Sequence, residues 1–323
     1  MAVFPFLQTT LGRRMDPVAH TLVGATLAQA GLKSRTALGT TTLVVGANLP
    51  DIDVLSYFWG GETALGFRRG LTHGALAWIV LPLAFTGCIL LWKSAMRWRG
   101  ADMDRVSGRQ VLLLATIAVA THPLLDLLNV YGIRLLMPFS GKWYYGDTLF
   151  IIDPWLWMIL AIGLWLSRKI RKAPAVALAA ATAYVAGMAV SNVVARSHVQ
   201  RWAQSEGVVV DEMMVAPLAV TPFARRIVVA DGAGYWVGMF EWPRAPGLEL
   251  ERLPYASTSS GLPNEVAVHE PNIEKFLTWA RFPYYLTVNE AERTMLYIGD
   301  ARYSVDPQHG WATTGVPIAV EPR

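Results

Sequence analysis

A series of long apolar segments separated by short basic loops constrains this chain more than any other feature of its sequence. Only 16% of the residues are charged and 53% are hydrophobic, whereas a soluble domain carries about 25% charged residues. The composition therefore argues against a wholly soluble protein, and it excludes disorder, a disulfide scaffold and a coiled coil. Four segments are long enough to cross a hydrocarbon core of about 30 Å: residues 75–92, 110–128, 149–167 and 173–195.

Two shorter apolar stretches, residues 17–32 and 36–50, come before these segments. They form either two short spans or a re-entrant hairpin. We therefore predict a membrane all-α helical bundle of about 5–6 apolar segments over residues 1–195. A C-terminal extramembrane domain over residues 196–323, α+β or mainly β, follows it. Its expected elements are a helix at about 272–280 and strands at 226–230, 235–242, 284–288, 294–298 and 303–305.

The charges divide unevenly between these two parts. Residues 1–195 hold 17 Lys and Arg against nine Asp and Glu, whereas residues 196–323 hold 11 against 15. The basic residues of the first part stand in short runs between apolar segments, which is typical of membrane topology and not of a nucleic-acid groove. We therefore expect no nucleic-acid partner.

The basic loops also predict the orientation of the bundle. Eleven basic residues fall on one side of the predicted spans and six on the other. The side richer in Lys and Arg is expected to be cytoplasmic, so the C-terminal domain faces outward, into the periplasm of a Gram-negative cell. Arg13 and Arg14 fit this arrangement least well, but they precede Met15, and translation starts at either Met1 or Met15. The first fourteen residues lack the pattern of a signal peptide.

Polar and ionisable side chains gather in five clusters at the ends of the apolar segments. Ionisable groups cost several kcal/mol at membrane depth, so each cluster is a candidate functional site. All five lie at the outward ends of the predicted helices, although the topology rests on Lys and Arg alone. The clusters are Asp16 with His20, Asn48 with Asp51 and Asp53, Arg68 to His73, His122 with Asp126 and Asn129, and Asp147 with Asp153.

The spacing within the clusters suits a metal ion. Asp16 and His20, like His122 and Asp126, are four residues apart and project from one face of a helix. Such a pair can ligate one cation, or the carboxylate can orient the imidazole. Three His and three or four Asp, without the lone cysteine, favour Zn²⁺, Mn²⁺ or a dinuclear site.

Each motif also has a purely structural interpretation. Asp16 and Asp51 are equally candidates for helix caps, and the two Asp/His pairs for structural hydrogen bonds. Arg68 and Arg69 are equally candidates for anchoring a helix end at the lipid headgroups. Aromatic residues near the segment ends favour an interfacial belt, and a surface or structural role is favoured for the histidines of the outer domain. These residues are Trp143, Tyr144, Tyr145, Trp155 and Trp157, and His198, His269 and His309.

Four of the motifs, in this order, resemble the YdjM/DUF457 family of bacterial inner-membrane proteins, which are described as metal-dependent hydrolases. The motifs are Met15-Asp16…His20, Asn48-Leu49-Pro50-Asp51-Ile52-Asp53, Arg69-Gly70-Leu71-Thr72-His73 and His122-Pro123-Leu124-Leu125-Asp126. More distantly, the His-x-x-x-Asp element is similar to one in zinc-dependent phospholipase C and related nucleases. The family resemblance, over residues 15–170, implies a multipass protein of the bacterial inner membrane. It also implies metal ligands at His20, Asp51, Asp53, His73, His122 and Asp126.

We therefore predict a membrane-embedded hydrolase of a lipid-borne or membrane-proximal ester, with a phosphoester as the leading substrate. One or two divalent metals, Zn²⁺ ahead of Mn²⁺ or Mg²⁺, would activate a water molecule. Asp53 and Asp126 would bridge two metals, ligate one metal or take the proton of the water molecule. Arg69 would neutralise the charge of a phosphate.

Two other functions remain open at this point. In one, a non-catalytic membrane protein uses the metal to staple its helices while the outer domain binds a protein partner. In the other, an ion or proton pathway, ionisable residues are expected at mid-membrane and on both faces, whereas here they lie near one side.

Overall fold

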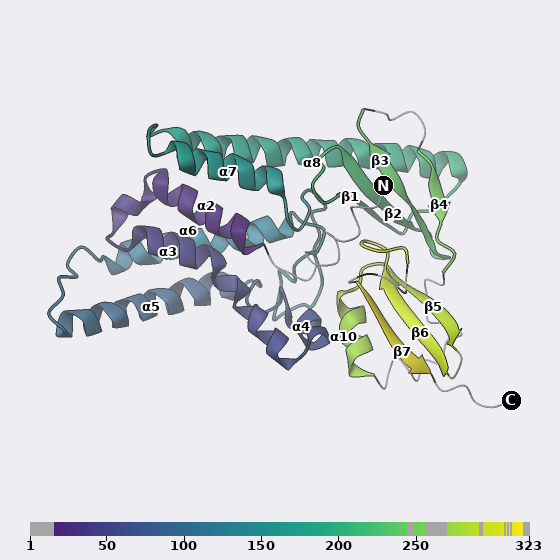
Figure 1. The fold of residues 1–323 in the computed structure, drawn as a ribbon, viewed down its shortest axis with the longest axis horizontal. Coiled ribbons are helices and arrows are strands. Elements are labelled where there is room, and N and C mark those ends of the chain that lie inside the picture. Colours follow the sequence, from purple (N-terminus) through teal and green to yellow (C-terminus); the bar gives the residue numbers. More distant parts are fainter. Residues whose placement is uncertain are drawn as a thin grey trace. The chain divides into compact units, whose positions relative to one another are not determined.

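The computed structural model describes residues 16–243, 248–255, 270–290, 293–306, 308, 310 and 312–318, and the chain divides into two compact units (Figure 1). One unit, which we call the helical unit, comprises residues 16–55 and 67–189. The other, the β unit, comprises residues 56–66 and the described residues from 190 onward. Met15, His269 and His309, which the sequence analysis singled out, lie outside the described residues.

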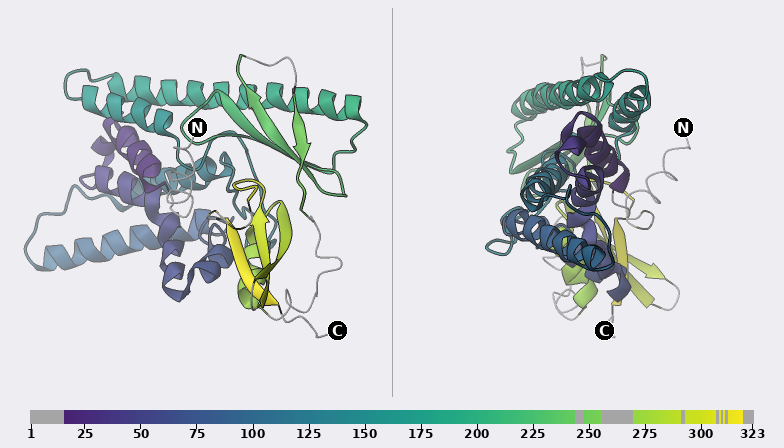
Figure 2. Two further views of the ribbon diagram at one scale, coloured as in Figure 1. Left: turned by 45° about the vertical axis from the view of Figure 1, so that its right-hand side comes forward. Right: turned by 90° about the vertical axis from the view of Figure 1, so that its left-hand side faces the viewer.

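Three helices in the described part of the chain are long and apolar enough to cross a membrane. They are α5 (Ala77–Trp98), α6 (Gly108–Leu127) and α8 (Ala173–Glu206). Large apolar side chains along α5, such as Ile79, Leu83 and Leu91, are more than half exposed, as expected of a helix that faces lipid. Figure 2 shows α8 as an uninterrupted helix in its left-hand view.

The structure has fewer spans than the 5–6 apolar segments expected. Residues 149–153 are not helical, and Asp153 caps α7 (Pro154–Leu166), which is only 13 residues long. The two preceding apolar stretches form α2 (Pro17–Gln29, 13 residues) and α3 (Gly39–Asn48, 10 residues), joined through η1 (Leu32–Arg35). At 1.5 Å per residue these three helices reach about 15–20 Å, which is shorter than a hydrocarbon core of about 30 Å.

Small residues allow α2, α3 and α6 to pack closely. Ala28, Ala47 and Ala118 are fully buried together with Leu43 and Leu114. Gly24 of α2 lies against the backbone of α3, where a Cβ atom would stand 2.5 Å from the Leu43 carbonyl oxygen. This packing fixes α2 and α3 relative to the end of α6.

The β unit contains two antiparallel sheets, as expected for the C-terminal domain. One sheet has the order β1-β2-β3-β4 and the other the order β5-β6-β7. The strands are β1 (Glu212–Pro217), β2 (Ala224–Ala230), β3 (Tyr235–Glu241), β4 (Leu250–Arg252), β5 (Pro283–Glu290), β6 (Arg293–Asp300) and β7 (Thr313–Ile318). A short helix, α4 (Gly61–Phe67), and helix α10 (Pro271–Trp279) accompany them.

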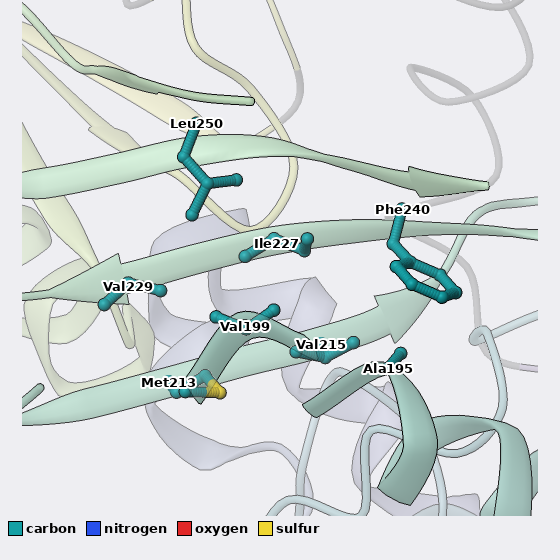
Figure 3. Packing of buried hydrophobic residues seen from close by; sticks show 8 residues of the cluster. All are labelled: Ala195, Val199, Met213, Val215, Ile227, Val229, Phe240 and Leu250. Atoms are coloured by element: carbon teal, nitrogen blue, oxygen red, sulfur yellow. The ribbon is translucent and has the colours of Figure 1, made fainter. Parts of the chain in front are cut away.

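The first sheet buries one face against the end of α8. Val215, Ile227 and Val229 of neighbouring strands pack with Ala195 and Val199 of α8 (Figure 3). These five side chains are fully buried, so this part of α8 belongs to a packed core and not to a lipid-facing surface. The strand expected at residues 303–305 is instead a turn after β6, where the buried Arg302 and Asp300 side chains pair.

Candidate metal centre

Three separate segments of the helical unit bring four candidate ligands together. Asp51 lies in η2 (Leu49–Trp59), which continues directly from α3. His73 lies in the turn that precedes α5, where its backbone N–H donates to the Gly70 carbonyl. His122 and Asp126 lie four residues apart in the last turns of α6. The site therefore sits at the start of one candidate membrane span and at the end of another.

The ligand atoms of these four residues all lie within 4.8 Å of one another. His73 Nε2 is 3.2 Å from His122 Nε2 and 3.2 Å from Asp126 Oδ2. His122 Nε2 is 3.3 Å from Asp51 Oδ1 and 3.5 Å from Asp126 Oδ2, and His73 Nε2 is 3.8 Å from Asp51 Oδ1. Four ligands at about 2.0–2.1 Å from Zn²⁺ in a tetrahedron are about 3.3 Å apart, so these distances suit one tetrahedral ion.

The far nitrogen of each histidine is held by a second group. His122 Nδ1 lies 2.7 Å from the Ala47 carbonyl oxygen, which can only accept, so Nδ1 carries the proton and the Nε2 lone pair faces the centre. His73 Nδ1 lies 3.0 Å from Thr72 Oγ1 and 3.5 Å from Asp53 Oδ2. A hydrogen-bond partner behind each ring is the arrangement that metal-binding histidines use to fix tautomer and orientation.

Arg69 holds the carboxylate of Asp126 from behind. Its Nη2 donates to Asp126 Oδ1 at 2.9 Å, its Nη1 donates to Asn129 Oδ1 at 2.8 Å, and its guanidinium lies 4.6 Å from the centre of the Tyr131 ring. The Arg69 backbone has a φ of 51°, and its N–H donates to Asp53 Oδ2 at 2.8 Å. Both terminal nitrogens of Arg69, the predicted phosphate-neutralising residue, are thus already bound to protein.

Two of the six predicted ligands, His20 and Asp53, lie beside the four-residue set without joining it. The His20 ring stacks on the His122 ring with centroids 3.6 Å apart, and its Nε2 is 3.6 Å from Asp126 Oδ1. Asp53 contacts the Arg69 backbone and the far side of His73. The candidate ligand set is therefore Asp51, His73, His122 and Asp126, and His20 and Asp53 contact members of that set.

The chemistry of this pocket fits a bound cation. Asp51 Oδ2 and Asp126 Oδ2 are buried without a hydrogen-bond partner among the described residues. Asp51 Oδ1 lies 3.3 Å from His122 Nε2. Two imidazole nitrogens with two carboxylate oxygens form a donor set typical of Zn²⁺.

A second pair of carboxylates, Asp16 and Asp153, lies close to the centre. Asp16 Oδ1 caps α2 by accepting from the Ala19 N–H, and its Oδ2 accepts from Trp157 Nε1 at 2.8 Å. Asp153 caps α7 and accepts from the Tyr184 hydroxyl at 2.9 Å. The sequence predicted that Trp157 belongs to an interfacial belt, and it did not indicate Tyr184. Trp157 lies 141 positions from Asp16, and Tyr184 lies 31 positions from Asp153, and no local sequence pattern links such distant pairs.

The remaining candidates are not among these four residues. Asp147 is buried in the loop before α7, and the His198 ring of the β unit lies 5.3 Å from that of Phe240. Neither of them belongs to the group of convergent ligand atoms found among the described residues.

The fold and the site define a membrane protein whose helical unit carries a buried Asp/His/His/Asp cluster, a candidate cation site. The chain belongs to the family of YdjM inner membrane proteins, whose model matches residues 15–198. It is also 25% identical over 124 residues to the uncharacterized protein YfhP of Bacillus subtilis (strain 168), a match that covers 38% of this chain and 35% of that protein. No solved structure matches.

Proposed function

We propose that this protein is a membrane-embedded, metal-dependent hydrolase of a lipid-borne or membrane-proximal ester, with a phosphoester as the leading substrate class. The observation that carries this proposal is the convergence of the Asp51, His73, His122 and Asp126 ligand atoms within 4.8 Å. The position of the site at the ends of α5 and α6 supports a substrate that lies in the membrane interface. Family membership supports a site of this kind in the matched region.

When bound, a divalent metal would supply Lewis acidity and lower the pKa of a coordinated water toward neutrality. Asp51, His73, His122 and Asp126 would hold it, and the donor set favours Zn²⁺ over Mg²⁺, which prefers octahedral oxygen ligands. Burial of these side chains excludes bulk water and strengthens each electrostatic contact. Asp53, whose Oδ2 lies 3.5 Å from His73 Nδ1, and Arg69, bonded to Asp126, would position the ligands.

The proposal is tested first by metal content. Purified full-length protein is expected to contain about one equivalent of zinc by elemental analysis, and His122→Ala is expected to lose it. His198→Ala, which changes a histidine outside the cluster, is the control. The outcome that contradicts the proposal is equal metal in the wild type and His122→Ala.

A second test separates catalysis from a structural role. Almost complete burial of His73 and His122 also suits a metal that staples α3, α6 and the turn before α5, with the outer domain binding a protein partner. A panel of phosphoesters, lipids and carboxylic esters should yield turnover that disappears in His122→Ala. If the metal is present and no substrate turns over, the stapling function is supported and the hydrolase proposal fails.

A further inference from the structure

A small cavity adjoins the candidate metal centre, with which it shares Asp126. It has a volume of about 20 Å³, and its polar lining is formed by Asp16, His20, Asp126, Asn129 and Asp153. A water molecule needs roughly 10–15 Å³ measured in this way, so the cavity has room for one group of about that size. Asp126 lines it as well as the metal centre, so the two sites share a wall.

The cavity walls carry negative charge that the protein does not neutralise. Asp16 and Asp153 are each 7% exposed, and no Lys or Arg of the described residues forms an ion pair with either. Their hydrogen-bond donors are neutral: backbone N–H groups, the Trp157 indole and the Tyr184 hydroxyl. Buried carboxylates without a cationic partner are costly, so the cavity favours a cation.

His20 provides an independent indication of a ligand. It is 3% exposed, and its Nδ1 has no hydrogen-bond partner in the described part of the chain. Because Nε2 faces the Asp126 carboxylate at 3.6 Å, the proton belongs on Nε2 and Nδ1 is left as an acceptor. A residue that lines the cavity therefore carries a buried acceptor without a donor.

These features select the kind of cation. Asp16 and Asp153 each already accept hydrogen bonds on both carboxylate oxygens. A carboxylate has about four acceptor positions, so each of the two residues retains at least one free acceptor position. Together with His20 Nδ1 they can accept three hydrogen bonds, which is the number that a primary ammonium group donates. A trimethylammonium group has no N–H donor and is larger than the cavity. Among the described residues, ligand atoms close enough for a divalent metal occur only in the neighbouring four-residue set.

We propose that this cavity binds a primary ammonium group of the substrate, held by Asp16, Asp153 and His20 beside the metal centre. The assignment of that group to a substrate rests on the proposed hydrolytic function, and it deepens that function by naming the substrate class: an ester that carries a primary amine close to the bond that is cleaved. The cavity shares Asp126 with the metal centre, so an ammonium bound there places the rest of the molecule against the metal ligands.

Binding is measured on the metal-free full-length protein in phosphatidylcholine nanodiscs, which contain no primary amine. Ethanolammonium chloride is titrated while the melting temperature is followed, with choline chloride and sodium chloride as comparisons at equal ionic strength. Only ethanolammonium is expected to give a saturable increase. An equal increase with choline or sodium overturns the proposal, as does the lack of any increase with ethanolammonium.

Two variants locate the site. Asp16→Asn and Asp153→Asn keep a side-chain oxygen for the helix cap, and each is expected to weaken ethanolammonium binding about 10-fold to 100-fold, since each loses a hydrogen bond to a charged group. Asp104→Asn, which removes an exposed carboxylate in the loop before α6, should bind as the wild type does. Unchanged binding in both cavity variants overturns the assignment.

Further experiments identify the source of the ammonium group and separate this proposal from the proposed hydrolase function. If a lipid headgroup occupies the cavity, nanodiscs containing phosphatidylethanolamine raise the melting temperature and abolish the response to added ethanolammonium. If a water-soluble amine is the ligand, the response stays the same in both nanodiscs. Ethanolammonium binding that persists in His122→Ala, together with a lack of ester turnover by the wild type, rejects the hydrolase function and leaves the cation site standing.

Discussion

Arg69 shows how a single buried residue can control the candidate metal centre without touching it. Its guanidinium bonds Asp126 and Asn129 at once and stacks near Tyr131. A planar fork of this kind fixes the carboxylate in one orientation, which a flexible lysine ammonium cannot do. We therefore propose that Arg69 positions Asp126, whereas its sequence motif suggested that it neutralises a phosphate.

Replacing Arg69 tests this assignment. Arg69→Gln is expected to weaken zinc binding about 10-fold to 100-fold, the range found for groups that orient metal ligands, and Arg69→Lys should recover only part of the loss. Zinc affinity is measured by competition with a chromogenic chelator. Arg109→Gln, on the exposed face at the other end of α6, is the matched control. Wild-type affinity in both Arg69 variants would contradict the positioning role.

Asp16 should make stability depend on pH. Burial, offset in part by hydrogen bonds from Ala19 and Trp157 and increased by the nearby Asp126 and Asp153 carboxylates, raises the pKa of Asp16 to about 6. The folded state therefore binds this proton more tightly than the unfolded state does. The resulting stabilisation is fully present below the unfolded pKa of 3.8 and is lost as the pH rises towards about 6.

The matching experiment compares wild type with Asp16→Asn in amine-free buffer. The Asn variant keeps the helix cap and removes the charge, so it should equal the wild type near pH 3, below the unfolded pKa of 3.8, and exceed it at pH 7.5. The difference at pH 7.5 should be up to about 3 kcal/mol. Thermal unfolding across this pH range measures it. A difference that stays constant with pH would show that the buried charge is not its cause.

At the scale of single residues, the sequence predicted the members of the site better than their roles. The i, i+4 spacing of His122 and Asp126 and the restriction of ionisable groups to helix ends led directly to the four convergent residues. The separation of ligands from supporting residues depends on contacts between distant positions. Arg69 and Asp126, for example, are 57 residues apart, and no periodicity encodes such a pair.

At the scale of helices, close packing of α2 on α3 fixes the geometry near the site. A Cβ atom on Gly24 would meet the Leu43 carbonyl oxygen at 2.5 Å, so Gly24→Ala must separate the two helices. Small-to-large changes in packed interiors cost about 1–3 kcal/mol. We expect a lower melting temperature and weaker zinc binding, because α2 carries His20 and α3 leads into Asp51.

Gly87→Ala is the control for this experiment. Gly87 also lies within an apolar helix, α5, but a Cβ atom there meets nothing within 4 Å. Alanine is favoured over glycine in a helix interior by about 0.5–1 kcal/mol, so this variant should be as stable as the wild type or slightly more stable. Equal effects of the two substitutions would show that the α2–α3 contact is unimportant.

The lengths of the elements were harder to predict than their types. Apolar composition predicted one helix over residues 149–167, but α7 begins only at Pro154 because the Asp153 side chain caps it through the Trp155 and Leu156 N–H groups. Strands β2 and β3 were expected from β-rich runs on either side of the turn at 231–234. Strands β1, β4 and β7 lack a comparable turn signal and were missed.

At the scale of the whole molecule, the direction of the helices relates the candidate centre to the sides of the membrane. The centre adjoins the beginning of α5 and the end of α6, whereas the basic residues Lys93, Arg97, Arg99 and Arg105 lie between Leu91 and Ser107, towards the other ends of these helices. Basic loops favour the cytoplasmic side. We therefore expect the candidate centre near the outer surface.

Reporter fusions test this orientation. Green fluorescent protein placed after Ala101, between α5 and α6, should fluoresce, because it folds in the cytoplasm. Alkaline phosphatase placed after Arg323 should be active, because it requires the periplasm. The basic residues at 168–172 come directly before α8 and favour the cytoplasmic side, so α8 leads the chain outward. This orientation requires residues 149–167 to cross the membrane, although only Pro154–Leu166 is helical. Exchanging the two reporters is the control, and both exchanged fusions should be silent. The reverse pattern would place the candidate centre at the cytoplasmic surface, and it would require a substrate from the inner leaflet in place of one from the outer leaflet.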